Sequence, residues 1–186
     1  KAHMCRDGAP GGYKIFNILE DGAVKWAYKP MKRDAAYQFR VYDLNNCYIT
    51  REVFCPGAKS KVSDSFFSQY AYGYDKPRSD NKLLVNVFDY DEGWTVKAFE
   101  GSKELNVGRV DTYDPLHVVH FNMARMNTNS TAMTFPTLKT SHMFEVQASD
   151  ALSSVTVVAT DRFGNEYRET VSRPRKLYDM SKASIY

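Results

Sequence analysis

The four histidines of this chain are the first candidates for metal or acid–base chemistry: His3, His117, His120 and His142. His117 and His120 are three residues apart and lie close to Asp114, so a three-ligand metal site can be drawn from them. The pair lacks the spacing and the acid of the H-E-x-x-H zinc helix, and on the strand predicted here the two rings point to opposite faces. We therefore interpret the histidines as structural residues.

The acidic run Asp89-Tyr90-Asp91-Glu92-Gly93 is superficially similar to a calcium loop. A calcium loop has its glycine at the sixth position, whereas Gly93 is the fifth residue, so we predict an acidic hairpin turn. The chain also lacks a G-x-S-x-G nucleophile elbow and a glycine-rich phosphate loop. These patterns predict a chain with no catalytic residues, no metal and no cofactor of its own.

Tyrosines alternate at Tyr70, Tyr72 and Tyr74. In an extended segment their three rings lie on one face, where they could stack on sugars or other planar ligands, with Trp94 as a further candidate. The alternative is that the tyrosines pin a long segment to a sheet while their hydroxyls stay in water. We favour pinning and keep the ligand platform as the second hypothesis.

The three cysteines, Cys5, Cys47 and Cys55, form no C-x-x-C pair, which argues against a zinc ribbon or a thioredoxin-type site. Cys47 and Cys55 could bridge two adjacent strands in an oxidising compartment. Three unpaired thiols are the equally weighted alternative.

Composition limits the class of protein. The chain has 186 residues, enough for one domain with a sizeable core. Its 25 Lys and Arg residues nearly balance 22 Asp and Glu residues, so no concentrated basic face points to a nucleic-acid partner. No apolar run approaches the roughly 18 residues of a membrane span.

Strand patterns dominate the chain, and its 13 Tyr and 11 Phe residues favour strands further. They predict an all-β fold: an antiparallel, immunoglobulin-like β-sandwich over residues 13–176. An N-terminal hairpin turns at Asp21-Gly22, residues 83–88 form a central strand, residues 56–81 form a long excursion, and residues 177–186 form a tail. The strands are expected at 13–19, 24–28, 38–42, 47–54, 83–88, 94–99, 105–110, 116–121, 143–148, 154–160 and 167–171.

Several segments, taken in order, resemble the C-terminal domain of bacterial calcineurin-like phosphoesterases, in which a metallophosphoesterase domain precedes a β-rich module. The resemblance rests on Asp7-Gly8-Ala9-Pro10-Gly11-Gly12-Tyr13, Trp26-Ala27-Tyr28-Lys29, Tyr37-Gln38-Phe39-Arg40-Val41-Tyr42, Val85-Asn86-Val87-Phe88-Asp89-Tyr90-Asp91, Asp114-Pro115-Leu116-His117, Thr140-Ser141-His142-Met143-Phe144 and Ala159-Thr160-Asp161-Arg162-Phe163-Gly164-Asn165.

The resemblance implies an upstream hydrolase domain with two divalent metals and a location in the periplasm or cell envelope. The metal-ligand motifs D-x-H, G-D-x-x-D, G-N-H-[DE] and G-H-x-H are not found in this chain. The expected function is therefore a non-catalytic accessory domain that docks on the hydrolase domain and helps to shape or cover it. The alternative is a module that binds glycans or another envelope ligand.

Residues 1–12 are rich in glycine and proline and are expected to form a shaped linker from the upstream domain. Its outer side should be exposed and unusually apolar. The predicted docking residues are those closest in sequence to that domain: Asp7, Gly8, Pro10, Gly12 and Tyr13.

Overall fold

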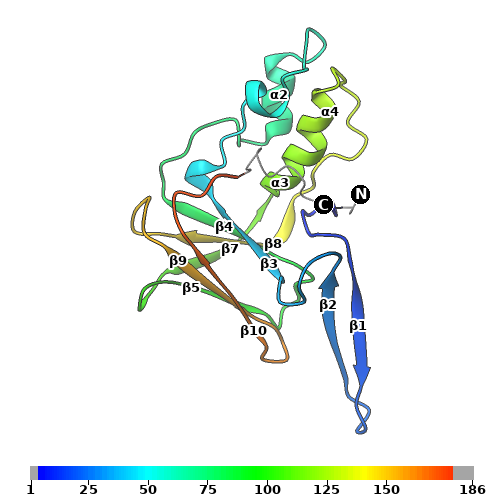
Figure 1. The fold of residues 1–186 in the computed structure, drawn as a ribbon, viewed down its shortest axis with the longest axis vertical. Helices are drawn as coiled ribbons and strands as arrows, with labels where there is room; N and C mark the ends of the chain where they lie inside the picture. The colour runs from blue at the N-terminus through cyan, green and yellow to red at the C-terminus, as the bar shows by residue number, and fades with distance from the viewer. Residues whose placement is uncertain (1–3, 178–186) are drawn as a thin grey trace.

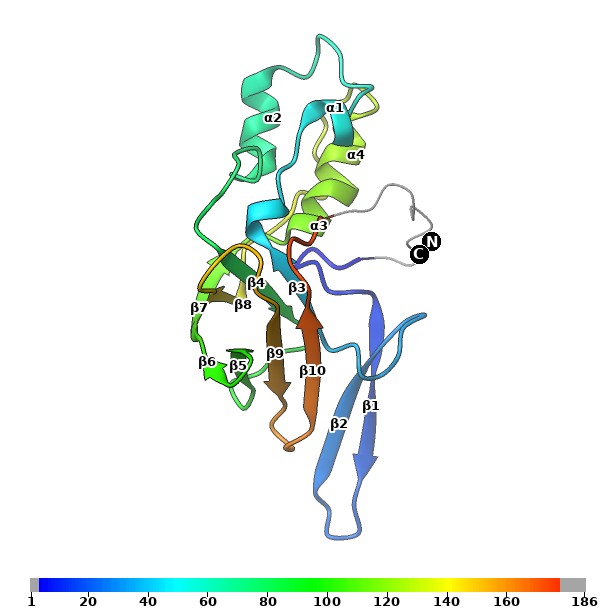
Figure 2. The ribbon, with the colours of Figure 1, turned by 60° about the vertical axis from the view of Figure 1, so that its left-hand side comes forward.

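The computed structural model of the protein describes residues 4–177, which are mostly β, with antiparallel sheets, an N-terminal hairpin and a few short helices (Figures 1 and 2). The strands are β1 (Gly12–Ile18), β2 (Val24–Pro30), β3 (Phe39–Asp43), β4 (Lys82–Val87), β5 (Thr95–Glu100), β6 (Lys103–Glu104), β7 (Asn106–Thr112), β8 (Thr140–Gln147), β9 (Val155–Thr160) and β10 (Glu166–Val171). The helices are the 3-10 helix η1 (Leu44–Asn46), α1 (Arg51–Phe54), α2 (Asp64–Ala71), α3 (Pro115–His117), the π-helix η2 (Val118–Met123) and α4 (Ala124–Met126).

Two four-stranded sheets, in the orders β10-β9-β5-β6 and β3-β4-β8-β7, share one apolar core. Alternate residues of β9 face this core, where Val155, Val157 and Ala159 are buried. Val41 and Val85 enter the same core from the other sheet. The antiparallel sandwich is thus present, while an immunoglobulin-like strand order is not confirmed.

Strand β4 lies between β3 and β8, which confirms the predicted central strand. Leu83 and Val85 face the sandwich core, and Leu84 faces a second core on the other side of the same sheet. The helices cover that second side (Figures 1 and 2). Because apolar layers cover both faces of this sheet, its central strand is apolar on both faces.

Two predicted strands are helical instead. Residues 116–121 belong to the consecutive helices α3 and η2, so His117 and His120 lie on a helix and not on a strand. Asp114 caps the first turn by accepting a hydrogen bond from the His117 N–H, and Pro115 occupies the first turn. In the predicted strand 47–54, residues 51–54 form α1, capped by Thr50.

The predicted excursion 56–81 is part of the fold. It contains α2, which Ser63 caps by accepting a hydrogen bond from the Phe66 N–H. Phe67 and Ala71 of α2 are buried in the core beneath the helices. Cys47 and Cys55 lie in the same core, and both are unpaired thiols.

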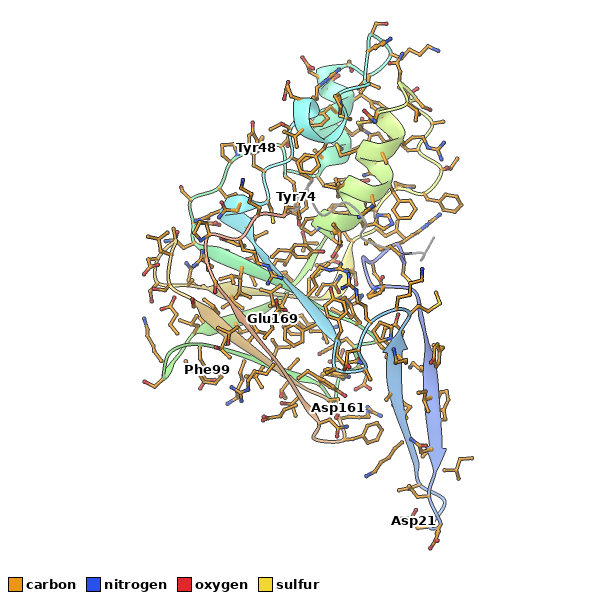
Figure 3. The ribbon with its side chains drawn as sticks, viewed as in Figure 1. Asp21, Tyr48, Tyr74, Phe99, Asp161 and Glu169 are labelled. Carbon is orange, nitrogen blue, oxygen red and sulfur yellow. The ribbon has the colours of Figure 1, made fainter. Side chains whose placement is uncertain are left out.

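The hairpin formed by β1 and β2 is a separate two-stranded sheet. It extends well beyond the two larger sheets (Figures 1 and 2). In Figure 3, Asp21 marks its far end, while Asp161 lies in the turn of the sandwich that faces the hairpin. The prediction of an N-terminal hairpin that turns at Asp21-Gly22 is confirmed, with Leu19 donating to the carbonyl of Ala23 across the turn.

Candidate docking surface on the N-terminal hairpin

The N-terminal loop, residues 4–11, packs on this chain's own sheet. The Asn86 side chain donates to the Asp7 carbonyl over 2.7 Å, and the Arg40 guanidinium donates to the Gly8 carbonyl over 2.9 Å. Gly8 and Pro10 are buried. The expected exposed apolar side is not observed: Ala9 and Pro10 are buried, and two buried polar side chains of β3 and β4 hold the loop in place. That residues 1–12 connect to an upstream domain stays a prediction.

The Asp7 side chain is half-buried and also satisfied within this chain. One carboxylate oxygen accepts from the Ala9 N–H over 2.9 Å, and the other lies 3.2 Å from His142 Nε2. Burial alone would raise the pKa of Asp7, but the hydrogen bonds from His142 and from Ala9 lower it below its ordinary value. Asp7 thus helps to close the loop on β8.

Asp114 is the buried centre beneath this loop. Its carboxylate accepts from the Tyr42 hydroxyl over 2.6 Å, from the Asn86 amide over 2.9 Å and from the His117 N–H over 2.8 Å. The Arg40 guanidinium lies 3.7 Å away and supplies a compensating charge. Burial raises the pKa of Tyr42 well above its ordinary value, so the hydroxyl stays protonated and donates. These hydrogen bonds fix the Asp114 carboxylate within the fold, as expected for a structural residue.

The histidines that the structure describes have structural surroundings. His117 is buried, its Nδ1 lies 2.6 Å from the Thr137 hydroxyl, and its ring stacks on Phe121. Burial lowers the pKa of His117 to about 4, so this ring is neutral near pH 7. Within residues 4–177, no three His, Cys, Asp or Glu side chains are grouped as metal ligands. His3 lies outside the described residues.

Seven of the twelve large apolar side chains that are exposed in the described residues lie on the hairpin and its flank. All seven residues of β1 are exposed, including Phe16 at 61% and Ile18 at 78%. Isolated two-stranded hairpins are marginally stable in water, and contiguous exposed apolar patches mark interaction sites. The exposed large apolar residues of the hairpin and its flank are Tyr13, Ile15, Phe16, Ile18, Leu19, Val24 and Met31.

One face of the hairpin is anchored to the sandwich through Trp26. The Trp26 ring meets the Phe163 ring edge-on at 4.9 Å, and the Arg162 guanidinium lies 5.1 Å from its centre. Arg162 in turn pairs with Asp91 of the acidic turn over 3.0 Å. Phe163, in the β9–β10 turn, thus packs on the hairpin.

A second ionic anchor lies on the same face, where the Lys14 ammonium pairs with Asp89 over 2.9 Å. Antiparallel alternation places Lys14, Phe16, Trp26 and Tyr28 on this face. Tyr13 and Ile15 therefore lie on the opposite face, which points away from the sandwich. Gly12 and Tyr13, two of the predicted docking residues, begin this exposed strand.

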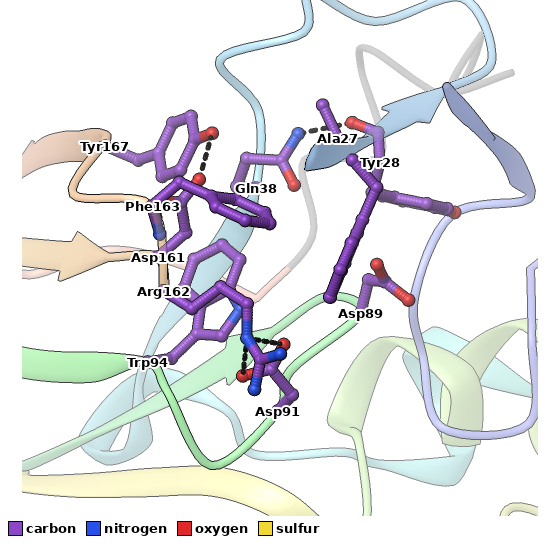
Figure 4. A pocket seen from close by; sticks show the side chains of 11 residues that line it. Ala27, Tyr28, Gln38, Asp89, Asp91, Trp94, Asp161, Arg162, Phe163 and Tyr167 are labelled. Carbon is purple, nitrogen blue, oxygen red and sulfur yellow. Dashed lines mark hydrogen bonds and ion pairs between the residues drawn. The ribbon is translucent and has the colours of Figure 1, made fainter. Parts of the chain in front are cut away.

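The crevice between hairpin and sandwich is too narrow for an organic ligand. Its free volume is about 10 Å³, room for roughly one water molecule. Trp94 stacks on Tyr167 at 5.7 Å in its wall, and the Tyr167 hydroxyl donates to Asp161 (Figure 4). Trp94 is thus a packed wall residue, not a free platform.

The three alternating tyrosines do not share one face. Tyr70 ends up in helix α2, Tyr72 has a left-handed backbone with φ +54°, and Tyr74 is buried. The Tyr72 ring stacks on Tyr113 at 3.7 Å, and the Tyr74 hydroxyl donates to the Tyr113 carbonyl over 2.7 Å. The extended geometry that a shared tyrosine face requires is not observed, and the contacts of Tyr72 and Tyr74 with Tyr113 are of the kind that the pinning hypothesis expects.

Comparison with known proteins gives one family. The model of a family described as the C terminal of calcineurin-like phosphoesterase matches residues 2–167. No significant match was found among curated proteins or among solved structures. In the described part of the chain, no helix is long and apolar enough to cross a membrane.

Proposed function

Because this chain belongs to the family of C-terminal domains of calcineurin-like phosphoesterases, we propose that it is a non-catalytic accessory domain that docks on the hydrolase domain of its parent protein. The hairpin β1–β2 is the proposed docking element, and docking helps to shape or cover the hydrolase domain. The observation that carries this proposal is the exposed apolar surface of a two-stranded sheet that projects from the sandwich.

The outward face of the hairpin has the composition of an interdomain contact. Tyr13 and Ile15 supply exposed apolar surface at its centre, and Lys25 and Lys29 flank them across the strand pair. Contacts between domains of one chain are partly polar, so the partner surface is expected to be apolar with acidic groups at its margin. Tyr13 and Gly12 stay in the proposed contact, whereas the buried Gly8 and Pro10 support it from beneath.

The metal chemistry of the family is assigned, by this proposal, to the hydrolase domain. The described residues of this chain offer no cluster of three metal-ligating side chains, so they do not fit a two-metal phosphoesterase centre. This chain would contribute binding and positioning only. We also propose a periplasmic or cell-envelope location, on the family resemblance.

The test is a pair of variants in the parent protein that carries both domains. Tyr13→Ser with Ile15→Ser removes apolar side chains from the outward face, and burying one such side chain is worth roughly 1.5–3 kcal/mol. The matched control is Leu152→Ser, because Leu152 is 69% exposed on the connection between β8 and β9.

The hairpin variant should increase cleavage by protease between the two domains and lower phosphoesterase activity, whereas the control should change neither. If the hairpin variant keeps full activity and full protease resistance, the hairpin does not dock on the hydrolase domain.

A further inference from the structure

The backbone edge of β1 is open, and we infer that it pairs with a strand of the hydrolase domain. The two-stranded hairpin would then become part of a sheet shared by both domains. This inference rests on the proposed function and specifies how the docking is made: by backbone hydrogen bonds along one edge, in addition to side-chain contacts on one face.

The hydrogen-bond pattern of the hairpin shows which backbone groups face outward. The Leu19 N–H donates to the Ala23 carbonyl, and at the other end the Met31 N–H donates to the Gly11 carbonyl. In an antiparallel pair, hydrogen-bonded and non-hydrogen-bonded residues alternate. The odd-numbered residues of β1 therefore bond to β2, and the backbone groups that point to the free edge belong to Gly12, Lys14, Phe16 and Ile18.

The outer edge of β2 is partly covered by the chain itself. Its even-numbered residues point outward by the same alternation, and the Gln38 side chain donates to the Tyr28 carbonyl over 2.6 Å. Pro30 has no N–H to offer. In both views of the ribbon β2 lies between β1 and the sandwich, so β1 is the outer strand (Figures 1 and 2). Within residues 4–177, β2 is the only strand that pairs with β1.

Strand β1 also lacks the features that protect exposed edges. Natural edge strands are blunted by proline, by bulges, by short length or by charged side chains. β10, an edge strand of the sandwich, carries exposed Glu166 and Arg168. β1 is seven residues long, contains no proline, and its one charged side chain, Lys14, is paired with Asp89. Such an edge is suited to accept another strand.

The position of Met4 favours the hydrolase domain as the partner that pairs with the edge of β1. Met4 forms an isolated antiparallel bridge with Pro10, two residues before β1 begins. Any segment that precedes Met4 therefore starts beside the base of the hairpin. Since this family is the C-terminal part of the phosphoesterases, we expect the hydrolase domain to precede it in the chain and to connect to it near the base of the hairpin.

Residue-resolved amide hydrogen exchange in the parent protein tests the inference. The amides of Phe16 and Ile18 should be protected by roughly 100-fold or more relative to a free strand edge. The amide of Val24, which points outward from the β2 edge, is the internal control and should exchange fast. Ile18 and Val24 are direct cross-strand partners, so they lie at the same distance from the tip of the hairpin.

Other outcomes of this experiment distinguish the inference of strand pairing from the proposed docking function. If the Phe16 and Ile18 amides exchange fast while the side chains of Tyr13 and Ile15 are buried by the hydrolase domain, docking uses the face alone and the inference of strand pairing is overturned. If neither edge nor face is covered, the proposed function fails as well. If protection depends on protein concentration, the occupant is a second copy of the chain, which also overturns the inference.

A matched pair of proline variants adds a second test. Ile18→Pro and Val24→Pro each remove one outward N–H and one exposed apolar side chain from the same hairpin face. Both leave the bonds between β1 and β2 intact, since proline is tolerated where the N–H faces out of the sheet.

Only Ile18→Pro should abolish the protection of the Phe16 amide and raise protease cleavage between the domains. Ile18→Thr, which keeps the N–H, should retain the protection. Equal effects of Ile18→Pro and Val24→Pro would overturn the inference.

Discussion

Replacing Gly8 by alanine should destabilise the whole domain, because the N-terminal loop is part of its core. Gly8 has φ +81°, and a Cβ at this position would lie 2.0 Å from Cγ of the buried Asp114. The left-handed backbone costs an alanine about 1–2 kcal/mol. Moving the Asp114 carboxylate away from one of its hydrogen-bond partners costs about 1.5–3 kcal/mol more. The free energy of unfolding should therefore fall by about 2.5–5 kcal/mol, a large share of the stability of a typical domain.

The control is Gly164→Ala in the turn between β9 and β10. Gly164 has φ +85°, and a Cβ there would meet nothing within 4 Å. This variant carries only the backbone cost of about 1–2 kcal/mol. Urea unfolding of the chain, followed by tryptophan fluorescence and by far-UV circular dichroism, gives both free energies of unfolding. If Gly8→Ala costs no more than Gly164→Ala, the loop does not pack on Asp114 and the description of the hairpin's base is wrong.

Two further predictions concern the acid stability of the domain and the hairpin anchor. Burial holds the pKa of His117 at about 4 in the folded protein. In the unfolded chain this histidine has an ordinary pKa near 6.5, so on acidification the unfolded state binds the extra proton first. The free energy of unfolding should therefore fall by about 3 kcal/mol as the pH falls from about 6.5 to 4. In a His117→Gln variant the urea midpoint should fall less steeply over this pH range. Some dependence on pH should remain from His120, because burial lowers its pKa as well. An unchanged dependence of the midpoint on pH would contradict the neutral, buried His117 ring. Trp26→Ala should remove the contact with Phe163 and speed proteolysis within the hairpin, with little change in the global unfolding midpoint. Phe16→Ala, at a side chain 61% exposed, should leave hairpin proteolysis in the isolated chain nearly unchanged, and equal effects of the two variants would argue against Trp26 as the anchor.

The strands of the sandwich were predictable because local patterns determine them. Residues 83–88 are apolar on both faces, and the structure places β4 in the centre of its sheet with apolar layers on either side. The Asp21-Gly22 turn likewise set the hairpin, since this dipeptide favours a tight connection between strands.

The helix at 116–121 was missed because its apolar run has no polar face. This segment is buried between the sheet and α2, so the helical period is not visible in its composition. A local signal was present: Asp114 followed by Pro115 is a typical helix start, with an N-cap acid and a proline in the first turn. Ser63 before α2 is a similar signal.

The candidate docking surface could not be predicted from the sequence, because it depends on contacts between distant parts of the chain. The burial of Gly8 is decided by Asp114 and Asn86, which are far from it in sequence, so the sequence of this glycine-rich loop does not show that it packs on the sheet. The exposure of β1 depends on the absence of a third strand beside it in the described residues. Alternating apolar residues predict a strand, but they do not reveal that both of its faces stay exposed in the described residues.

Covalent footprinting of aromatic side chains by hydroxyl radicals tests the central claim most directly. Labelling of Tyr13, on the outward face, is measured in the parent protein and in the 186-residue chain, with Tyr48, 47% exposed outside the hairpin, as the reference. If the hydrolase domain covers the outward face of the hairpin, labelling of Tyr13 should drop several-fold in the parent protein while labelling of Tyr48 stays constant. Equal labelling of the hairpin in both proteins would contradict the docking account.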